Sequence, residues 1–124
     1  MKCILVADDD PALRELIHDS LEVLGHEMLI VDNGEEVLRK LEERLPDLIL
    51  LDIQIPAIDG ISLVRQIRNS PRWSGLKIVA LSAFAMRGDD QKALDAGFDA
   101  YLKKPIGVAE LRKQVQRLLL DRNC

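Results

Sequence analysis

Polar side chains stand directly after short apolar runs of the sequence. The aspartates 8–10 follow the run CILVA, Asp52 follows LILL, Ser82 follows KIVAL, and Lys104 comes shortly after a fourth run. Carboxylates that are held close together raise each other's pKa unless a cation lies among them. Their oxygens suit Mg²⁺ better than Zn²⁺, and a metal, an ammonium and a hydroxyl together offset the charge of a transferring phosphoryl group. These residue types point to phosphoryl chemistry in which an aspartate can be the nucleophile.

Two hydrophobic periodicities alternate five times and place these polar residues at strand ends. Continuous apolar runs are typical of strands buried on both faces. They predict strands at 3–7, 28–31, 48–51, 77–81 and 100–102. Apolar residues at helical spacing predict the helices between and after them. These helices are expected at 11–24 with Gly25 as the cap, 37–45 before Pro46, 61–68, 89–96 with Gly97 as the cap, and 108–119.

Five strand-then-helix units with short connections predict an α/β fold with a parallel sheet and helices on both faces. The 124 residues predict one domain, residues 1–124. A parallel sheet places its first, third and fourth strands side by side in the middle, and ligands bind outside the carboxyl ends of such strands. The polar residues at those ends are therefore expected to converge.

Composition excludes several classes of protein. Seventeen basic and 21 acidic residues give a net charge of -4, which weighs against a nucleic-acid-binding protein. No apolar run approaches a membrane span or a signal peptide, so a cytoplasmic location is expected. Cys3 and Cys124 form neither a disulfide framework nor a zinc site. His18 and His26 lack supporting ligands and are expected at the surface.

Four segments together resemble the receiver domain of two-component response regulators. They are ILVADDDPALR (4–14), PDLILLDIQIPAIDG (46–60), IVALSAFAM (78–86) and DAGFDAYLKKPI (95–106). No segment suffices alone, but together they cover essentially the whole chain. The resemblance implies a flavodoxin-like (βα)5 fold with the strand order 2-1-3-4-5.

The resemblance assigns roles to the acidic residues. Asp52 matches the aspartate that is phosphorylated, which would attack the phosphorus of a phosphohistidine. Asp8 and Asp9 match the acidic pair that holds Mg²⁺ or Mn²⁺, with Asp9 the more direct ligand. The backbone carbonyl of Gln54 would complete the metal site. Asp10 matches a position that is commonly acidic but not essential, and by itself it is a candidate N-cap of the first helix.

The resemblance also implies phosphate contacts and a switch. Lys104 and the backbone N–H of Ala83 would contact the phosphoryl oxygens, and a cis peptide is implied before Pro105. On phosphorylation the Ser82 hydroxyl would move to the phosphoryl group and the ring of Tyr101 would turn inward. Such a switch is a two-state element that a local charge biases.

Two positions depart from the commonest pattern of the family. Ile55 replaces a frequent methionine before Pro56, which conserves volume. Phe84 is large and apolar, and in the family this position and Gln54 flank the path of the hydrolytic water. Phe84 is therefore expected to slow the loss of the phosphoryl group.

The implied partners are a histidine kinase or a histidine phosphotransfer protein and a downstream protein. The downstream protein would bind the face of the fourth helix, fifth strand and fifth helix, whereas the first helix commonly docks the phosphodonor. No direct contact with nucleic acid, no membrane insertion, and a monomer or weak homodimer are expected. Such a domain promotes its own phosphotransfer and slow dephosphorylation, but it is not a multiple-turnover enzyme.

Three other functions remain open at this point. A phosphatase of the haloacid dehalogenase type would use an Asp-x-Asp motif such as residues 8–10, but Ala12 stands where Thr or Val belongs. It also needs a later acidic motif, and only Glu110 and Asp121 follow the lysine. A flavodoxin-like electron carrier would need aromatic residues, which are only 3% of the chain. A receiver that acts only as a scaffold would not need all the key positions to be filled.

Overall fold

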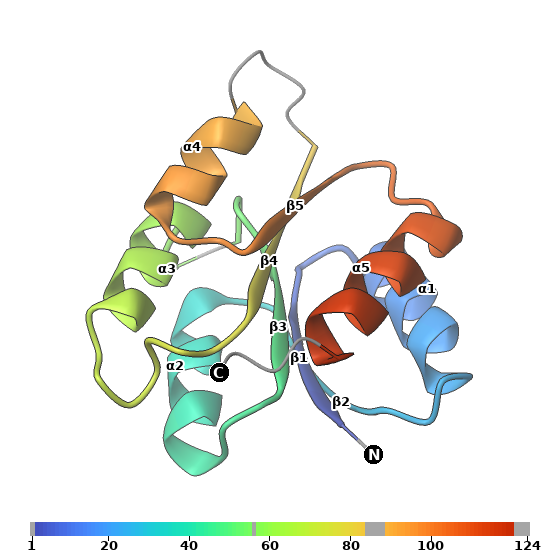
Figure 1. The fold of residues 1–124 in the computed structure, drawn as a ribbon, viewed down its shortest axis with the longest axis horizontal. Helices are drawn as coiled ribbons and strands as arrows, with labels where there is room; N and C mark the ends of the chain where they lie inside the picture. Colours follow the sequence, from blue (N-terminus) through green and yellow to red (C-terminus); the bar gives the residue numbers. More distant parts are fainter. Residues whose placement is uncertain (1, 56, 84–88, 121–124) are drawn as a thin grey trace.

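Five parallel strands form the centre of the computed structural model, which describes residues 2–55, 57–83 and 89–120 (Figure 1). The strands are β1 (Cys3–Ala7), β2 (Glu27–Val31), β3 (Leu48–Asp52), β4 (Ile78–Ser82) and β5 (Ala100–Lys103). Their order is β2-β1-β3-β4-β5, and every neighbouring pair is parallel. The expected α/β fold and its strand order are confirmed. Asp52 and Ser82 are the last residues of their strands rather than the first residues beyond them.

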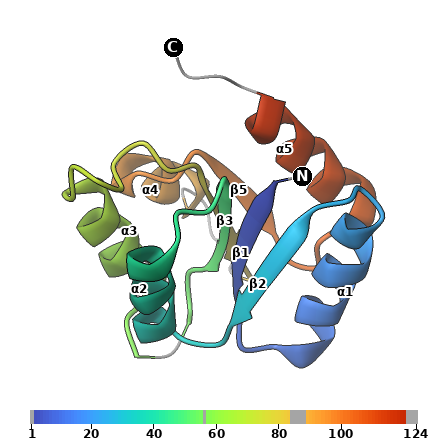
Figure 2. The same ribbon diagram turned by 90° about the horizontal axis from the view of Figure 1, so that it is seen from below.

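Helices cover both faces of the sheet (Figure 2). One layer contains α1 (Pro11–Glu22) and α5 (Val108–Leu120); the other contains α2 (Gly34–Glu43), α3 (Gly60–Arg68) and α4 (Asp89–Ala96). Alternate residues of a strand point to opposite faces. Ile4 and Val6 of β1 accordingly pack in the core beneath α1 and α5, and Leu5 and Ala7 pack in the other core. Within the described residues, no helix is long and apolar enough to span a membrane.

Helix α1 begins as expected and ends two residues early. The Asp10 carboxylate accepts a hydrogen bond from the Ala12 N–H at 3.0 Å, so Asp10 is the N-cap. The helix ends at Glu22 rather than at Leu24. Gly25 lies in the following turn with φ of +81°, a conformation that favours glycine. Leu24 is still partly buried, because the turn folds it back against the core.

The predicted end of α2 was wrong. Leu45 was expected on the apolar face of this helix, but the helix ends at Glu43 and Leu45 is 49% exposed. Arg44 is extended and donates two hydrogen bonds to the Glu27 carboxylate, at 2.8 and 2.9 Å. A proline makes helical backbone unfavourable for the residue before it, and Leu45 precedes Pro46. Apolar spacing alone did not reveal this stop.

The N-cap of α3 leads to a stability prediction. Asp59 accepts the backbone N–H and the hydroxyl of Ser62 at 2.9 and 2.8 Å, and the backbone hydrogen bond is the main cause of its lowered pKa. We expect Asp59→Ala to lower the free energy of unfolding by about 1 kcal/mol at neutral pH. Because the folded-state pKa is the lower one, this difference should be lost as the pH falls through it. Urea unfolding tests this. Asp59→Asn, which can still cap, should stay near wild type, and an equal loss in both variants would contradict the cap.

Candidate functional site

Strands β1 and β3 bring three carboxylates together at the carboxyl edge of the sheet. Asp8, Asp9 and Asp52 each offer an oxygen within 4.8 Å of the others. Asp8 is fully buried and Asp52 is 4% exposed, whereas Asp9 is exposed. The Asp8 N–H donates to the carbonyl of Val31 at 3.1 Å, which continues the β1–β2 ladder and fixes the Asp8 backbone.

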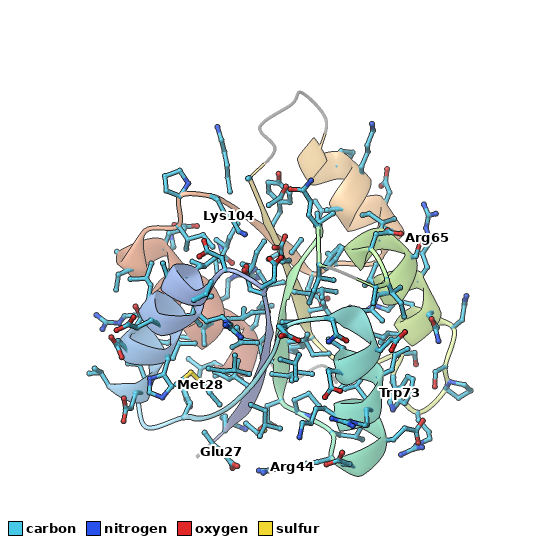
Figure 3. All side chains as sticks on the ribbon, turned by 180° about the vertical axis from the view of Figure 1, so that it is seen from behind. Glu27, Met28, Arg44, Arg65, Trp73 and Lys104 are labelled. Atoms are coloured by element: carbon cyan, nitrogen blue, oxygen red, sulfur yellow. The ribbon has the colours of Figure 1, made fainter. Side chains whose placement is uncertain are left out.

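Lys104 supplies the one cation placed between these carboxylates among the described residues. Its Nζ lies 3.1 Å from Asp8 Oδ2, within ion-pair distance, and donates a hydrogen bond to Asp52 Oδ2 at 3.2 Å. The backbone N–H of Lys104 donates to the Ser82 carbonyl at 2.7 Å. The Lys104–Pro105 peptide is cis, as the resemblance implied. In Figure 3, Lys104 lies at the end of the molecule opposite Glu27.

Burial and neighbouring charges have opposite effects on the pKa values of Asp8 and Lys104. Burial raises the pKa of the Asp8 carboxyl above its ordinary value, and the Asp52 charge adds to this; the Asp10 N–H and the Lys104 ammonium oppose both. Burial would lower the pKa of Lys104, but its contacts with Asp8 and the charge of Asp52 outweigh burial and raise it. The contacts with Asp8 and the charge of Asp52 therefore stabilise the charged form of Lys104.

A tight loop after β3 orients Asp52. The Asp52 carboxylate accepts the Gln54 N–H at 2.9 Å, and the Ile55 N–H donates to the Asp52 carbonyl at 3.3 Å. The loop closes where the Gly60 N–H donates to the Ile53 carbonyl at 2.7 Å. A Cβ on Gly60 would lie 2.5 Å from the Cα of Ile53. Sequence reasoning missed this role of Gly60, although an Asp-Gly pair before a helix is a signal for a tight turn.

The two residues of the expected switch share one face of the sheet. Ser82 is 2% exposed, and Ala80 lies two residues before it on the same face of β4. Ala80 is in register with Tyr101, which is partly buried against the core beneath α2, α3 and α4. Ala83 follows β4 and is exposed. Pro56 and Phe84 lie outside the described residues, so the expectation for Phe84 stays a prediction.

An open, largely apolar groove lies beside Lys104. It has a volume of about 440 Å³ and lies between α1 and the segments that follow β4 and β5. Its lining consists of Asp10, Ala12, Leu13, Leu16, Ala83, Lys104, Pro105 and Ile106. The groove therefore offers an apolar contact surface directly beside the Lys104 ammonium, which the sequence did not reveal.

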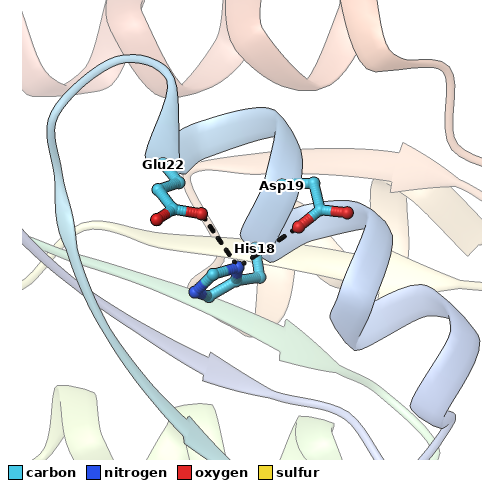
Figure 4. A group of neighbouring side chains, drawn as sticks. All are labelled: His18, Asp19 and Glu22. Carbon is cyan, nitrogen blue, oxygen red and sulfur yellow. Dashed lines mark hydrogen bonds and ion pairs between the residues drawn. The ribbon is translucent and has the colours of Figure 1, made fainter.

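A second group of possible ligands lies on the outside of α1 (Figure 4). His18 Nδ1 lies 3.4 Å from Asp19 and 3.5 Å from Glu22, and the three side chains are 44–69% exposed. Exposed ion pairs of this kind contribute little to stability. His18 thus lies at the surface as expected. His26 does so only in part, because its Nδ1 is buried and has no hydrogen-bond partner within the described part of the chain.

The donor set at the strand ends fits a hard divalent cation. Asp8, Asp9 and Asp52 offer carboxylate oxygens, and no histidine or cysteine belongs to this cluster among the described residues. Three carboxylates and one ammonium leave a formal charge of about -2, which a divalent ion would cancel. The groups present therefore fit Mg²⁺ or Mn²⁺ better than Zn²⁺.

The geometry of Lys104 leads to a second prediction. We expect Lys104→Met to lower the free energy of unfolding in chelator by about 1–3 kcal/mol, because buried Asp8 loses its ammonium partner. Added Mg²⁺ should restore part of the loss. Urea unfolding in EDTA and in Mg²⁺ measures both effects. Lys103→Met, at an exposed neighbouring position, is the matched control. Equal stability of the two variants in EDTA would contradict the ion pair.

Comparison with known proteins agrees with this geometry. The family model of the response regulator receiver domain matches residues 4–116. The polar-differentiation response regulator DivK of Brucella anthropi is 32% identical over 120 residues, which cover 97% of this chain and 98% of that protein. A response regulator structure from Chloroflexus aurantiacus has a TM-score of 0.92 at 31% identity and covers 97% and 98% of the two chains.

A third relative is informative about the metal. The receiver domain of a sensor histidine kinase from Pseudomonas aeruginosa was solved with a magnesium ion coordinated in the active site cleft. Its TM-score is 0.88 at 35% identity, and the match covers 97% of this chain and 98% of that one.

Proposed function

The chain belongs to the receiver domain family of response regulators, which are phosphoacceptor domains of two-component signalling systems, and from this premise we propose that Asp52 is its phosphoacceptor. The observation that carries the proposal is the position of Lys104, whose ammonium lies between the carboxylates of Asp8 and Asp52. A phosphohistidine of a kinase or phosphotransfer protein would be the donor.

The transfer step uses groups that this chain already holds in place. A carboxylate oxygen of Asp52 attacks the phosphorus, the phosphorus–nitrogen bond to the donor histidine breaks, and the electron pair returns to the imidazole, which takes up a proton. Lys104 Nζ, 3.2 Å from Asp52 Oδ2, offsets the charge of the transferring group. The hydroxyl of Ser82 and the N–H of Ala83 are proposed to bind its other oxygens.

Asp8, Asp9, Asp52 and the carbonyl of Gln54 are proposed to hold Mg²⁺ or Mn²⁺. When bound, the ion would neutralise negative charge on the phosphoryl oxygens and between the carboxylates. Because Asp8 is buried and its pKa is raised, its ionisation is expected to be coupled to the arrival of the cation. Asp9 is exposed and can contact the ion from the solvent side.

We propose that the phosphoryl group switches the outer surface through Ser82 and Tyr101. Ser82 and Tyr101 belong to neighbouring strands and share a face of the sheet, which supports a linked movement. The downstream protein would bind the face formed by α4, β5 and α5. The apolar groove between α1 and the segment after β5 would receive the phosphodonor, because it borders Lys104. The protein would act as a monomer or weak homodimer in the cytoplasm.

Intact-mass measurement after incubation with acetyl phosphate tests the proposal. We expect one phosphoryl group per chain in Mg²⁺ and none in EDTA. Because acetyl phosphate is a small molecule, labelling depends only on the residues of this chain and not on a donor protein. Absence of labelling in Mg²⁺ would contradict the proposal. Turnover of a phosphomonoester in large excess over the protein would instead favour the phosphatase of the haloacid dehalogenase type.

A further inference from the structure

His18, Asp19 and Glu22 lie together on the outside of α1 (Figure 4). His18 and Glu22 are four residues apart, so their side chains are neighbours on one face of the helix. One ligand atom from each of the three residues lies within 4.8 Å of the other two. An imidazole nitrogen with two carboxylate oxygens is a donor set that Zn²⁺ and similar divalent transition metals accept. The cluster therefore differs in chemistry from the three carboxylates at the strand ends.

The distances between the ligand atoms match those around a tetrahedral metal ion. His18 Nδ1 lies 3.4 Å from Asp19 Oδ1 and 3.5 Å from Glu22 Oε2. Two ligands that bind Zn²⁺ at about 2.0–2.2 Å, with a tetrahedral angle between them, are about 3.3–3.6 Å apart. Both distances are longer than a typical hydrogen bond of about 2.7–3.2 Å. One ion can thus contact the imidazole and both carboxylates after only small side-chain rotations.

The two carboxylates lie at the end of α1 that disfavours negative charge. Helix α1 ends at Glu22, and its last turn contains no basic residue. The carboxyl end of a helix carries a partial negative charge, so anionic side chains are unfavourable there and a cation is favourable. Among the described residues, Asp19 and Glu22 form ion pairs with His18 and not with a lysine or an arginine. A divalent cation would offset both carboxylates and interact favourably with the helix end.

The backbone that carries these side chains is fixed from the opposite side of the helix. Ile17, Ser20 and Leu21 are buried on that side. The carbonyl of Ser20 accepts a hydrogen bond from Nε of Arg112, a residue of α5, at 2.9 Å. Ligands on a rigid element are ordered before the metal arrives, which lowers the entropy cost of binding. The arrangement is therefore built on a packed helix rather than on a loop.

We propose that His18, Asp19 and Glu22 form a metal site, separate from the strand ends, that binds Zn²⁺ or a divalent transition metal of similar preference. His18 Nδ1, Asp19 Oδ1 and Glu22 Oε2 are its ligands. Because the three side chains are 44–69% exposed, a fourth coordination position faces the solvent. Three protein ligands with one open position are a common zinc arrangement. The proposal does not depend on the phosphorylation of Asp52.

Isothermal titration calorimetry of the full chain with Zn²⁺ tests the site. Saturating Mg²⁺ is present to occupy the proposed strand-end site, and a non-chelating reductant keeps the cysteines reduced. We expect one Zn²⁺ per chain, and His18→Gln and Glu22→Gln should each weaken binding by about tenfold or more. The matched controls are His26→Gln, at the only other histidine, and Glu15→Gln, at another exposed glutamate of α1. Both should bind Zn²⁺ within about twofold of the wild type.

NMR spectra of the ¹⁵N-labelled chain locate the ion in the same titration. Zn²⁺ should shift the Nδ1 resonance of His18 and the backbone amide resonances of residues 18–22. The amides of residues 8–9 and 52–54 should keep their positions while Mg²⁺ is present. Shifts confined to 8–9 and 52–54 would show that Zn²⁺ binds at the strand ends, and they would overturn the proposed site.

Three calorimetric results would also overturn it. They are binding that is unchanged in both His18→Gln and Glu22→Gln, a loss in His26→Gln as large as that in His18→Gln, and binding that does not saturate by about 1 mM Zn²⁺. Loss in the two ligand variants alone, with shifts at residues 18–22, would support the site.

Discussion

Asp52→Asn is expected to accept no phosphoryl group from acetyl phosphate under conditions that label the wild type. An amide has no carboxylate oxygen that can act as the nucleophile, although its size and its position at the end of β3 are retained. The expected loss is therefore complete rather than partial. Intact mass after incubation in Mg²⁺ measures it directly, and peptide mapping of the labelled wild type should place the group in the peptide that contains residue 52.

Asp19→Asn is the matched control for the loss of one carboxylate. Asp19 lies on the outside of α1 with its side chain 69% exposed, and it does not belong to the cluster of carboxylates at the strand ends. This variant should be labelled like the wild type. A phosphoryl group that survives in Asp52→Asn would show that the acceptor is another residue, and it would redirect attention to Asp8 or Asp9.

Gly60→Ala should lower both the stability of the chain and the labelling of Asp52. The added Cβ would lie 2.5 Å from the Cα of Ile53 and 3.0 Å from the carbonyl oxygen of Asp52. Both are backbone atoms, and the Gly60 N–H donates to Ile53 at 2.7 Å, so the loop cannot move aside without losing that bond. We expect the free energy of unfolding to fall by about 1–3 kcal/mol. Labelling at Asp52 should fall too, because the same loop orients its carboxylate.

Urea unfolding followed by the fluorescence of Trp73, the only tryptophan of the chain and 8% exposed, measures the loss. Gly75→Ala is the matched control, since a Cβ there would meet nothing within 4 Å. It should change the free energy of unfolding by no more than about 0.5 kcal/mol. A Gly60→Ala variant as stable as Gly75→Ala would contradict the close approach of the two loop segments.

The strands were readable from the sequence because both faces of the sheet are buried. The apolar side chains of runs such as LILL point to both faces of the sheet, so both faces must be covered by helices to bury them. The alternation of such runs with amphipathic segments indicates a parallel topology. Helix ends were harder to predict. Leu24 and Leu45 continue the apolar spacing of α1 and α2, yet both lie beyond the helices, because a turn or a proline ends helical backbone before side-chain periodicity stops.

The convergence of the polar residues followed from topology, but their contacts did not. Parallel strands end at one edge, so Asp8 and Asp52 had to be near each other once β1 and β3 were neighbours. The position of Lys104 depends on the path of the chain after β5, which no periodicity records. The hydrogen bonds that Arg68 donates to the carbonyls of Gly97 and Ser74 were equally hidden, because every residue has a backbone carbonyl. Trp73 lies in the connection between α3 and β4, and its burial there had no signal in the spacing.

A crystal structure of the chain with Mg²⁺ and beryllofluoride tests the central claim most directly. We expect the fluoroberyllate on a carboxylate oxygen of Asp52, in contact with Lys104 Nζ and the Ser82 hydroxyl. The Mg²⁺ ion should be held by Asp8, Asp9, Asp52 and the carbonyl of Gln54. A fluoroberyllate bound to a different carboxylate, or an ion that does not touch Asp52, would contradict the account.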